Sequence, residues 1–180
     1  GGIKELFGAD PEHFETLGQL PLVPVVGETS VLVTAGARHR RKRKLLMPPF
    51  HGERMRAYGQ LMQALARRAL EGRTSGATLC AQDVTTAISL EVIIHAVFGI
   101  TDPARAARFR EVLSDYVESY TPILAALPVL RRNFGGHGPW ARFQRNAAAL
   151  EALLDQELAA RRAREAGQED ILSLLLAARD

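Results

Sequence analysis

The sequence predicts a mainly α-helical domain, and three observations carry this prediction. Apolar residues recur at helical spacing in several segments, glycines and prolines separate these segments, and alternating strand patterns are nearly absent. The chain has 180 residues, of which 47% are apolar and 24% charged, so it is large enough to enclose a core. We therefore expect a single domain over residues 1–180, built as a multi-helix array.

The predicted helices begin at residues that favour helix termini. Thr34 is expected to cap the helix over residues 35–47, and Asp83 or Thr85 the helix over residues 83–98. The helix over residues 83–98 is apolar on nearly all sides, so we expect it to be buried. In chain order, the predicted helices cover residues 3–7, a segment that starts near Asp10 and Pro11, and residues 35–47, 54–71, 83–98, 101–119, 140–164 and 168–179.

The sequence also predicts where the connections between helices are irregular and how the chain begins and ends. Residues 20–33 and 120–139 contain several prolines and predict irregular connections between helices. The chain opens directly on a helical pattern, and it stops after the apolar run 171–176 without a glycine or proline stop signal. We therefore expect the chain to be a part of a longer protein.

Composition limits the chemistry and the compartment. The single cysteine, Cys80, excludes an internal disulfide and a multi-cysteine metal site, and it is expected to be a small buried side chain. His95 lies in an apolar helix and is expected to be a hydrogen-bonded core histidine, and no histidine spacing indicates a metal site. No apolar stretch is long enough to span a bilayer, and a secretory leader is absent, so a cytoplasmic location is expected.

The formal charge of +3 comes mostly from residues 38–44, six of which are Arg or Lys. His39, Arg43 and Leu46 share one helix face, because residues three and four apart are neighbours on a helix. Leu46 belongs in a core, so His39 and Arg43 are expected on or beside the buried face. A guanidinium in that position requires an anion, which a distant carboxylate of the chain or a bound ligand could supply.

The order of residue types in this segment is more specific than the spacing of its charged residues. Residues 36–55, GARHRRKRKLLMPPFHGERM, closely resemble helix C and its continuation in bacterial-type cytochrome P450 enzymes. Residues 3–14 resemble helix B of that family, residues 90–99 resemble helix E, and residues 169–180 resemble the helix before the long central oxygen-activating helix. The resemblance covers essentially the whole chain. It implies a partial cytochrome P450 fold, an orthogonal array of helices without the central helix and without the region of the cysteine ligand.

The resemblance assigns roles to the basic helix. In this family a His or Trp and an Arg four residues later hold the haem propionates, which implies that His39 and Arg43 bind haem b, iron protoporphyrin IX, in the longer protein. Arginine suits a carboxylate because its planar fork donates two parallel hydrogen bonds. Arg40, Arg41 and Lys44 are expected on the side where such enzymes dock an acidic electron donor of the ferredoxin or flavodoxin type. A merely solvated charged face is the alternative for these three residues.

The iron ligand of this family has no counterpart in the chain. That ligand is a cysteine thiolate in a Gly-rich loop late in the protein, whereas Cys80 precedes the segment that resembles helix E. We therefore assign no catalytic and no metal-binding residue, and we expect the chain alone to lack monooxygenase activity. We also expect it to fold poorly alone, because it would expose the faces that pack on haem and on the central helix.

Two apolar connections are the candidate substrate-facing parts. In the family, the connection that corresponds to residues 20–33 passes over the haem, and the one that corresponds to residues 120–134 roofs the substrate access route. An apolar segment clamped on the core is the alternative for each. The residues expected to contact a hydrophobic small-molecule substrate are Val25, Val26, Ser30, Val31 and Leu124.

The resemblance implies a fragment of a haem-dependent monooxygenase that oxidises an apolar organic substrate with O2 and electrons from a redox partner. The alternative is a catalytically inactive helical module that binds a protein or a nucleic acid through residues 38–44. Nucleic acid is the weaker of these partners, because no aromatic stacking platform and no known reader motif accompany the basic run. A membrane partner is not expected.

Overall fold

A computed structural model describes residues 2–10, 19–71, 76, 78–133, 135–163 and 170–177, and the regular elements in these ranges are helices. The predicted mainly α fold is therefore confirmed. The expected helix start at Pro11 falls outside the described residues. The helices are α1 (Gly2–Gly8), α2 (Gln19–Val26), α3 (Gly36–Leu46), α4 (Glu53–Leu70), α5 (Ala81–Val92), α6 (Pro103–Ser119), α7 (Pro122–Ala126), α8 (Pro139–Arg162) and α9 (Ile171–Ala177).

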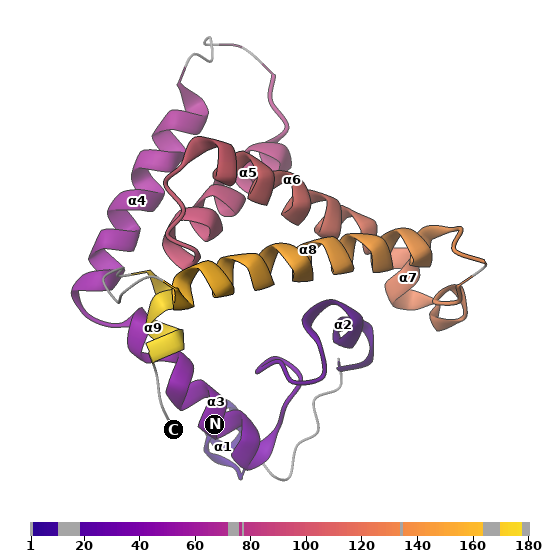
Figure 1. Cartoon of the computed structure of the whole chain (residues 1–180). Helices are drawn as coiled ribbons and strands as arrows, with labels where there is room; N and C mark the ends of the chain where they lie inside the picture. The colour runs from indigo at the N-terminus through magenta and orange to yellow at the C-terminus, as the bar shows by residue number, and fades with distance from the viewer. Residues whose placement is uncertain are drawn as a thin grey trace.

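The helix α8 crosses the middle of the molecule (Figure 1). It has α5 and α6 on one side and α2 and α3 on the other, and α7 and α9 lie near its opposite ends. Its closest partner along its length is α6, while α4 packs on α5. None of the helices in the described part of the chain has the length and apolar character that a membrane crossing requires.

The core lies where the end of α5, the helix α6 and the helix α8 meet. A π-helical turn, Ile93–Val97, continues α5 and places Ile94 and Ala96 in the interior. The rings of Phe98 and Phe109 lie 5.2 Å apart between their centroids, in a tilted arrangement that is favourable for aromatic pairs. The buried residues of this cluster are Ile94, Ile100, Ala106, Phe109 and Leu153.

The start of α5 differs from the prediction. The helix begins at Ala81, before both predicted caps, and the hydroxyl of Thr85 donates back to the carbonyl of Ala81 at 2.9 Å instead of capping the terminus. Cys80 stands at the N-cap and is exposed, so the predicted burial of this cysteine is wrong. The predicted burial of the helix is also wrong for α5 itself, where Val84 is the buried residue. The apolar residues of the π-helical turn carry the burial instead.

The region before α3 also departs from the prediction. Gln19–Val26 is helical although an irregular connection was expected. Pro21 is compatible with the helix because it lies in the first turn, where an N–H has no helical partner. Gly27 follows with φ +77°, a left-handed conformation that favours glycine at a helix end. Ala35 is the N-cap of α3 and Thr34 does not cap it: its hydroxyl donates to the carbonyl of Ser30 at 3.1 Å.

Candidate functional site

The basic helix α3 lies apart from the core. It makes its main contacts with the short 3-10 turn Pro48–Phe50 that follows it, and none of its residues is buried. It starts at Gly36, whose φ of +58° favours a glycine. The ammonium group of Lys42 donates a hydrogen bond to the carbonyl of Thr29, and this bond attaches α3 to the segment after α2.

His39 and Arg43 lie one turn apart on the same face of α3, about 6 Å along the helix axis. His39 is half-buried, and Arg43 is exposed. Leu46, expected in the core, is only half-buried, so this face is less enclosed than the sequence predicted. Neither the imidazole of His39 nor the guanidinium of Arg43 has a hydrogen bond or an ion pair with any described residue. Both groups are therefore able to donate to an external anion.

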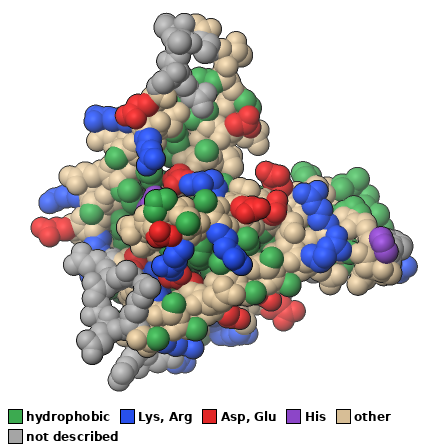
Figure 2. All heavy atoms as spheres, turned by 45° about the horizontal axis from the view of Figure 1, so that its top comes forward, with side chains coloured by type: hydrophobic (Ala, Val, Ile, Leu, Met, Phe, Trp, Pro, Cys, Tyr) green, Lys and Arg blue, Asp and Glu red, His purple; other side chains and the backbone are tan. Residues whose placement is uncertain are grey.

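The other predicted basic residues of α3, Arg40, Arg41 and Lys44, are exposed. No acidic residue interrupts the helix, so like charges three and four apart repel one another and leave a positive potential. Figure 2 shows a different pattern on the face that carries α5 and α6, where acidic and basic side chains are interspersed. The concentrated positive charge is thus a property of α3.

The predicted substrate-facing residues lie on two segments that meet. The helix α2 contacts α7. Val25 and Val26 at the end of α2 are half-buried, as are Ser30 and Val31 in the turns that follow. Leu124 of α7 is fully buried at 0% exposure, so it packs inward in this conformation. Other apolar residues on and after α7 are exposed: Ile123, Leu127 and Val129. Figure 2 shows hydrophobic side chains gathered at the α7 end of the molecule.

Two tyrosines attach α2 to the rest of the molecule, and the sequence analysis did not identify them. The hydroxyl of Tyr116 donates to the carbonyl of Val25 at 2.5 Å, and the hydroxyl of Tyr120 donates to the carbonyl of Pro21. Burial and then the charge of Glu151 raise the pKa of Tyr116 above its ordinary value. The sequence feature that could have indicated this contact is the pair of tyrosines four residues apart at the end of the helix predicted over residues 101–119.

His95 is half-buried in the π-helical turn, and its Nε2 lies 3.3 Å from an oxygen of Glu91. The other oxygen of Glu91 accepts from Arg110 of α6 at 2.5 Å. His95 is therefore near a carboxylate, but the expected placement in the core is wrong, because its side chain is 25% exposed. The three side chains line a hollow of about 460 Å³ between α4, α5 and α6.

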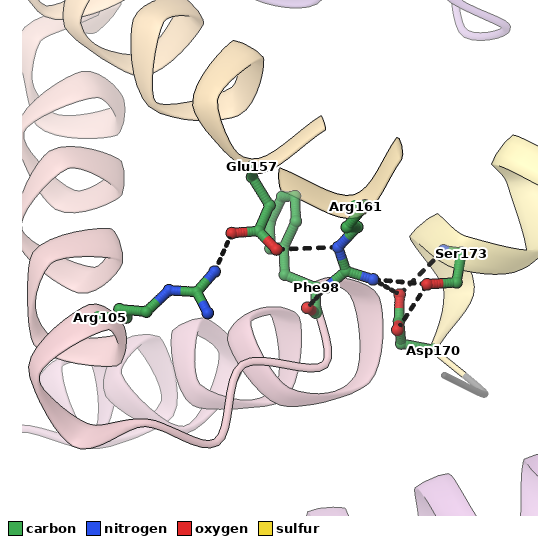
Figure 3. A network of polar contacts seen from close by, with 6 residues as sticks. All are labelled: Phe98, Arg105, Glu157, Arg161, Asp170 and Ser173. Atoms are coloured by element: carbon green, nitrogen blue, oxygen red, sulfur yellow. Dashed lines mark hydrogen bonds and ion pairs between the residues drawn. The ribbon is translucent and has the colours of Figure 1, made fainter. Parts of the chain in front are cut away.

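A buried charged network joins the end of α8 to two other elements (Figure 3). The guanidinium of Arg161 donates to Glu157 at 2.8 Å, to Asp170 at 2.5 Å and to the carbonyl of Phe98. Arg105 of α6 donates to the second oxygen of Glu157. The network therefore connects α6, α8, the residue after the π-helical turn and the start of α9.

The surroundings of this network set the protonation of its members. Burial alone would raise the pKa of Asp170, but hydrogen bonds from Arg161 and Ser173 outweigh it and hold the pKa below its ordinary value. Burial alone would lower the pKa of Arg161, yet the bonds to Asp170 and Glu157 leave it raised. Both groups are thus charged at neutral pH. Because their donors and acceptors are used internally, this network stabilises the fold rather than forming a reactive site.

No family model matches the chain. The putative cytochrome P450 135A1 of Mycobacterium tuberculosis is 36% identical over 183 aligned positions, which cover 99% of this chain and 40% of that protein. The putative cytochrome P450 135B1 of Mycobacterium bovis is 30% identical, with coverages of 99% and 38%. The putative cytochrome P450 138 of Mycobacterium bovis is 29% identical, with coverages of 96% and 39%.

A solved structure agrees with this relationship at the level of the fold. A retinoic acid-bound cyanobacterial CYP120A1 superposes with a TM-score of 0.70 and 21% sequence identity, over 93% of this chain and 36% of that one. The chain spans about 40% of the length of the curated relatives it matches. The resemblance stated from the sequence is therefore confirmed, both for the sequence and for the helical fold.

Proposed function

The chain corresponds to a part of a cytochrome P450, and on this premise we propose that it supplies the haem-propionate contacts of a haem-dependent monooxygenase. The reaction proposed for the whole protein is the oxidation of an apolar organic molecule with O2 and with electrons from a redox partner. A cytoplasmic location is part of this proposal.

The observation that carries the proposal is the pair His39 and Arg43. They present two donors on one face of α3, one turn apart, without a partner among the described residues. The two propionates of haem b are carboxylates, and a guanidinium with an imidazole N–H is a suitable donor set for them. When bound, haem supplies the oxygen activation, which the side chains described here do not.

The role proposed for the chain's own residues is binding and orientation. Arg43 donates two parallel hydrogen bonds to one carboxylate, and His39 donates an N–H from the adjacent turn. Lys42 holds α3 to the segment after α2, so the binding face and the candidate substrate segment are kept in a fixed relation. Since Arg43 is exposed, we expect its contribution to affinity to lie at the low end for a charge-assisted bond.

We propose that the exposed cations Arg40, Arg41 and Lys44 dock an acidic electron donor of the ferredoxin or flavodoxin type. A surface of one charge sign raises the association rate of an acidic partner, and the helix that carries these cations contains no acidic residue. This attraction should weaken with salt, because the Debye length falls from about 10 Å at 0.1 M to about 3 Å at 1 M.

The substrate proposed for the whole protein is a hydrophobic small molecule. On this chain it would contact Val25 and Val26 of α2 and Ser30 and Val31 beyond it, which are all half-buried. Leu124 packs inward and would reach a substrate only after α7 moves. The chain on its own is proposed to be inactive, since Cys80 is not assigned as the thiolate ligand.

A haemin titration followed by the Soret band tests the propionate role. Arg43→Ala is expected to weaken haemin binding roughly tenfold, the effect of about 1.4 kcal/mol, through the loss of a charge-assisted contact. Arg38→Ala is the matched control, because it removes the same charge from an exposed position of the same helix. Equal affinities of these two variants would contradict the proposal.

A further inference from the structure

An aromatic cluster occupies the corner between α2, α6 and α8. Phe143 of α8 is its centre and is 3% exposed. Its ring centroid lies 5.5 Å from that of Tyr116, 5.1 Å from that of Tyr120 and 5.3 Å from that of Trp140. These distances are those of favourable aromatic pairs, so the corner is a well-packed support for the two tyrosines.

The two tyrosine hydroxyls reach the same neighbouring helix. Tyr116 donates to Val25 O, and Tyr120 donates to Pro21 O. The donors are four residues apart at the end of α6, and the acceptors are four residues apart on α2, so each pair is separated by about one helical turn. Two bonds at this separation fix the orientation of α2 as well as its position.

The helix α2 depends on such support. It has eight residues, with Pro24 inside it, and helices of this length are unstable alone in water. The carbonyl of Val25 lies in the last turn, where carbonyls have no partner within the helix, and Tyr116 satisfies it. From Pro21 to Val26 no residue of α2 is buried, and Leu22 is 46% exposed. Apolar burial of this stretch is therefore only partial.

We propose that Tyr116 and Tyr120 are positioning residues that hold α2 against the α6–α8 corner and thereby fix the candidate substrate residues Val25 and Val26 relative to α7. The helix α2 carries Val25 and Val26 and contacts α7, so its position determines how far the two segments stand apart. The ligand class is an apolar small molecule, and this identity rests on the proposed function. The raised pKa of Tyr116 supports the role, because the hydroxyl keeps its proton and remains a donor in alkaline solution.

The first experiment measures amide hydrogen exchange of the segment 19–33. The variants are Tyr116→Phe, Tyr120→Phe and the double variant, in which the rings of the cluster remain and only the hydroxyls are lost. We expect exchange to accelerate roughly fivefold for each hydroxyl, the effect of one hydrogen bond, with the fluorescence of Trp140, the only tryptophan, nearly unchanged. The third tyrosine provides a matched control as Tyr58→Phe, since it lies on α4. Equal exchange in the double variant and in this control would overturn the proposal.

The second experiment measures whether this positioning of α2 affects the binding of an apolar ligand. Stopped-flow dissociation of anilinonaphthalene sulfonate, an apolar fluorescent probe, is expected to be several-fold faster from the double variant than from the Tyr58→Phe control. If exchange in segment 19–33 rises while probe dissociation does not change, the tyrosines stabilise α2 without positioning the candidate substrate residues, and the proposal is wrong. Failure of the proposed function would be seen in a different measurement, the haemin titration. If Arg43→Ala does not change haemin affinity, the hydrogen exchange and probe dissociation of the tyrosine variants are unaffected.

Discussion

Arg161 and Asp170 form a buried ion pair, with Nη1 of the guanidinium 2.5 Å from Oδ1 of the carboxylate and each side chain 5% exposed. The pair links the last turn of α8 to the residue before α9. Ser173 closes the same junction, because its backbone N–H donates to Oδ1 of Asp170 at 2.9 Å. The start of α9 is therefore set by a carboxylate that caps one helix and neutralises an arginine of another.

Replacing Arg161 should destabilise the fold strongly. Arg161→Ala leaves Asp170 buried without its cation and removes one of the two arginines that pair with Glu157, so we expect the free energy of unfolding to fall by about 3–5 kcal/mol. Urea unfolding measures this change. Arg162→Ala is the matched control, because Arg162 is the exposed neighbour, and its loss should cost less than about 0.5 kcal/mol. Similar losses for the two variants would show that the buried network contributes little.

Gly99 should resist substitution for two reasons. Its φ is +54°, and an added Cβ would lie 2.8 Å from the Cβ of Asp170. We expect Gly99→Ala to cost clearly more than the roughly 1–2 kcal/mol of a left-handed alanine, because Asp170 must also shift. Gly36→Ala separates the two effects, since Gly36 has φ +58° and nothing within 4 Å of an added Cβ. Equal destabilisation of the two variants in thermal unfolding would exclude the steric contribution.

Asp170 should make stability depend on pH in acid. Its pKa in the fold lies below the ordinary value of 3.8, so the folded state binds its proton less readily than the unfolded state. The resulting stability is present above pH 3.8 and is lost as the pH falls through the folded pKa. Asp170→Asn should flatten this part of the curve of unfolding free energy against pH. An unchanged acid limb in the variant would assign the pH dependence to other carboxylates.

The parts of the fold that the sequence predicted correctly have local causes. The helix predicted over residues 101–119 is α6, and in the structure Asp102 caps it by accepting from the N–H of Arg105 at 2.8 Å, with Pro103 as the first residue of the helix. The long helix α8 was predicted over residues 140–164, and its two ends differ from the prediction by one or two residues, since residues with high helix propensity fill it. Propensity and capping are properties of neighbouring residues, which is why a sequence reveals them.

The parts that were missed depend on residues far apart in the chain. Phe98 and Arg161 are separated by 63 residues, and Tyr116 and Val25 by 91, so no local pattern indicates their contacts. The prolines of α2 indicated a loop, and this prediction was wrong. The hydroxyls that support the helix come from Tyr116 of α6 and from Tyr120 directly after it, far away in the sequence. For the candidate site, the spacing of His39 and Arg43 could be read from the sequence. The low burial of this face could not, since none of the residues of α3 is buried.

The central claim is that His39 and Arg43 bind the haem propionates, and the most direct measurement compares haemin with its dimethyl ester. Esterification removes both carboxylate charges while the ring and the iron are kept. We predict that Arg43→Ala weakens the binding of haemin roughly tenfold but leaves the affinity for the dimethyl ester nearly unchanged, so that the two effects give a coupling of about 1.4 kcal/mol. His39→Ala should show the same pattern with a smaller coupling. If Arg43→Ala weakens haemin and its dimethyl ester equally, Arg43 does not contact the propionates and the account is contradicted.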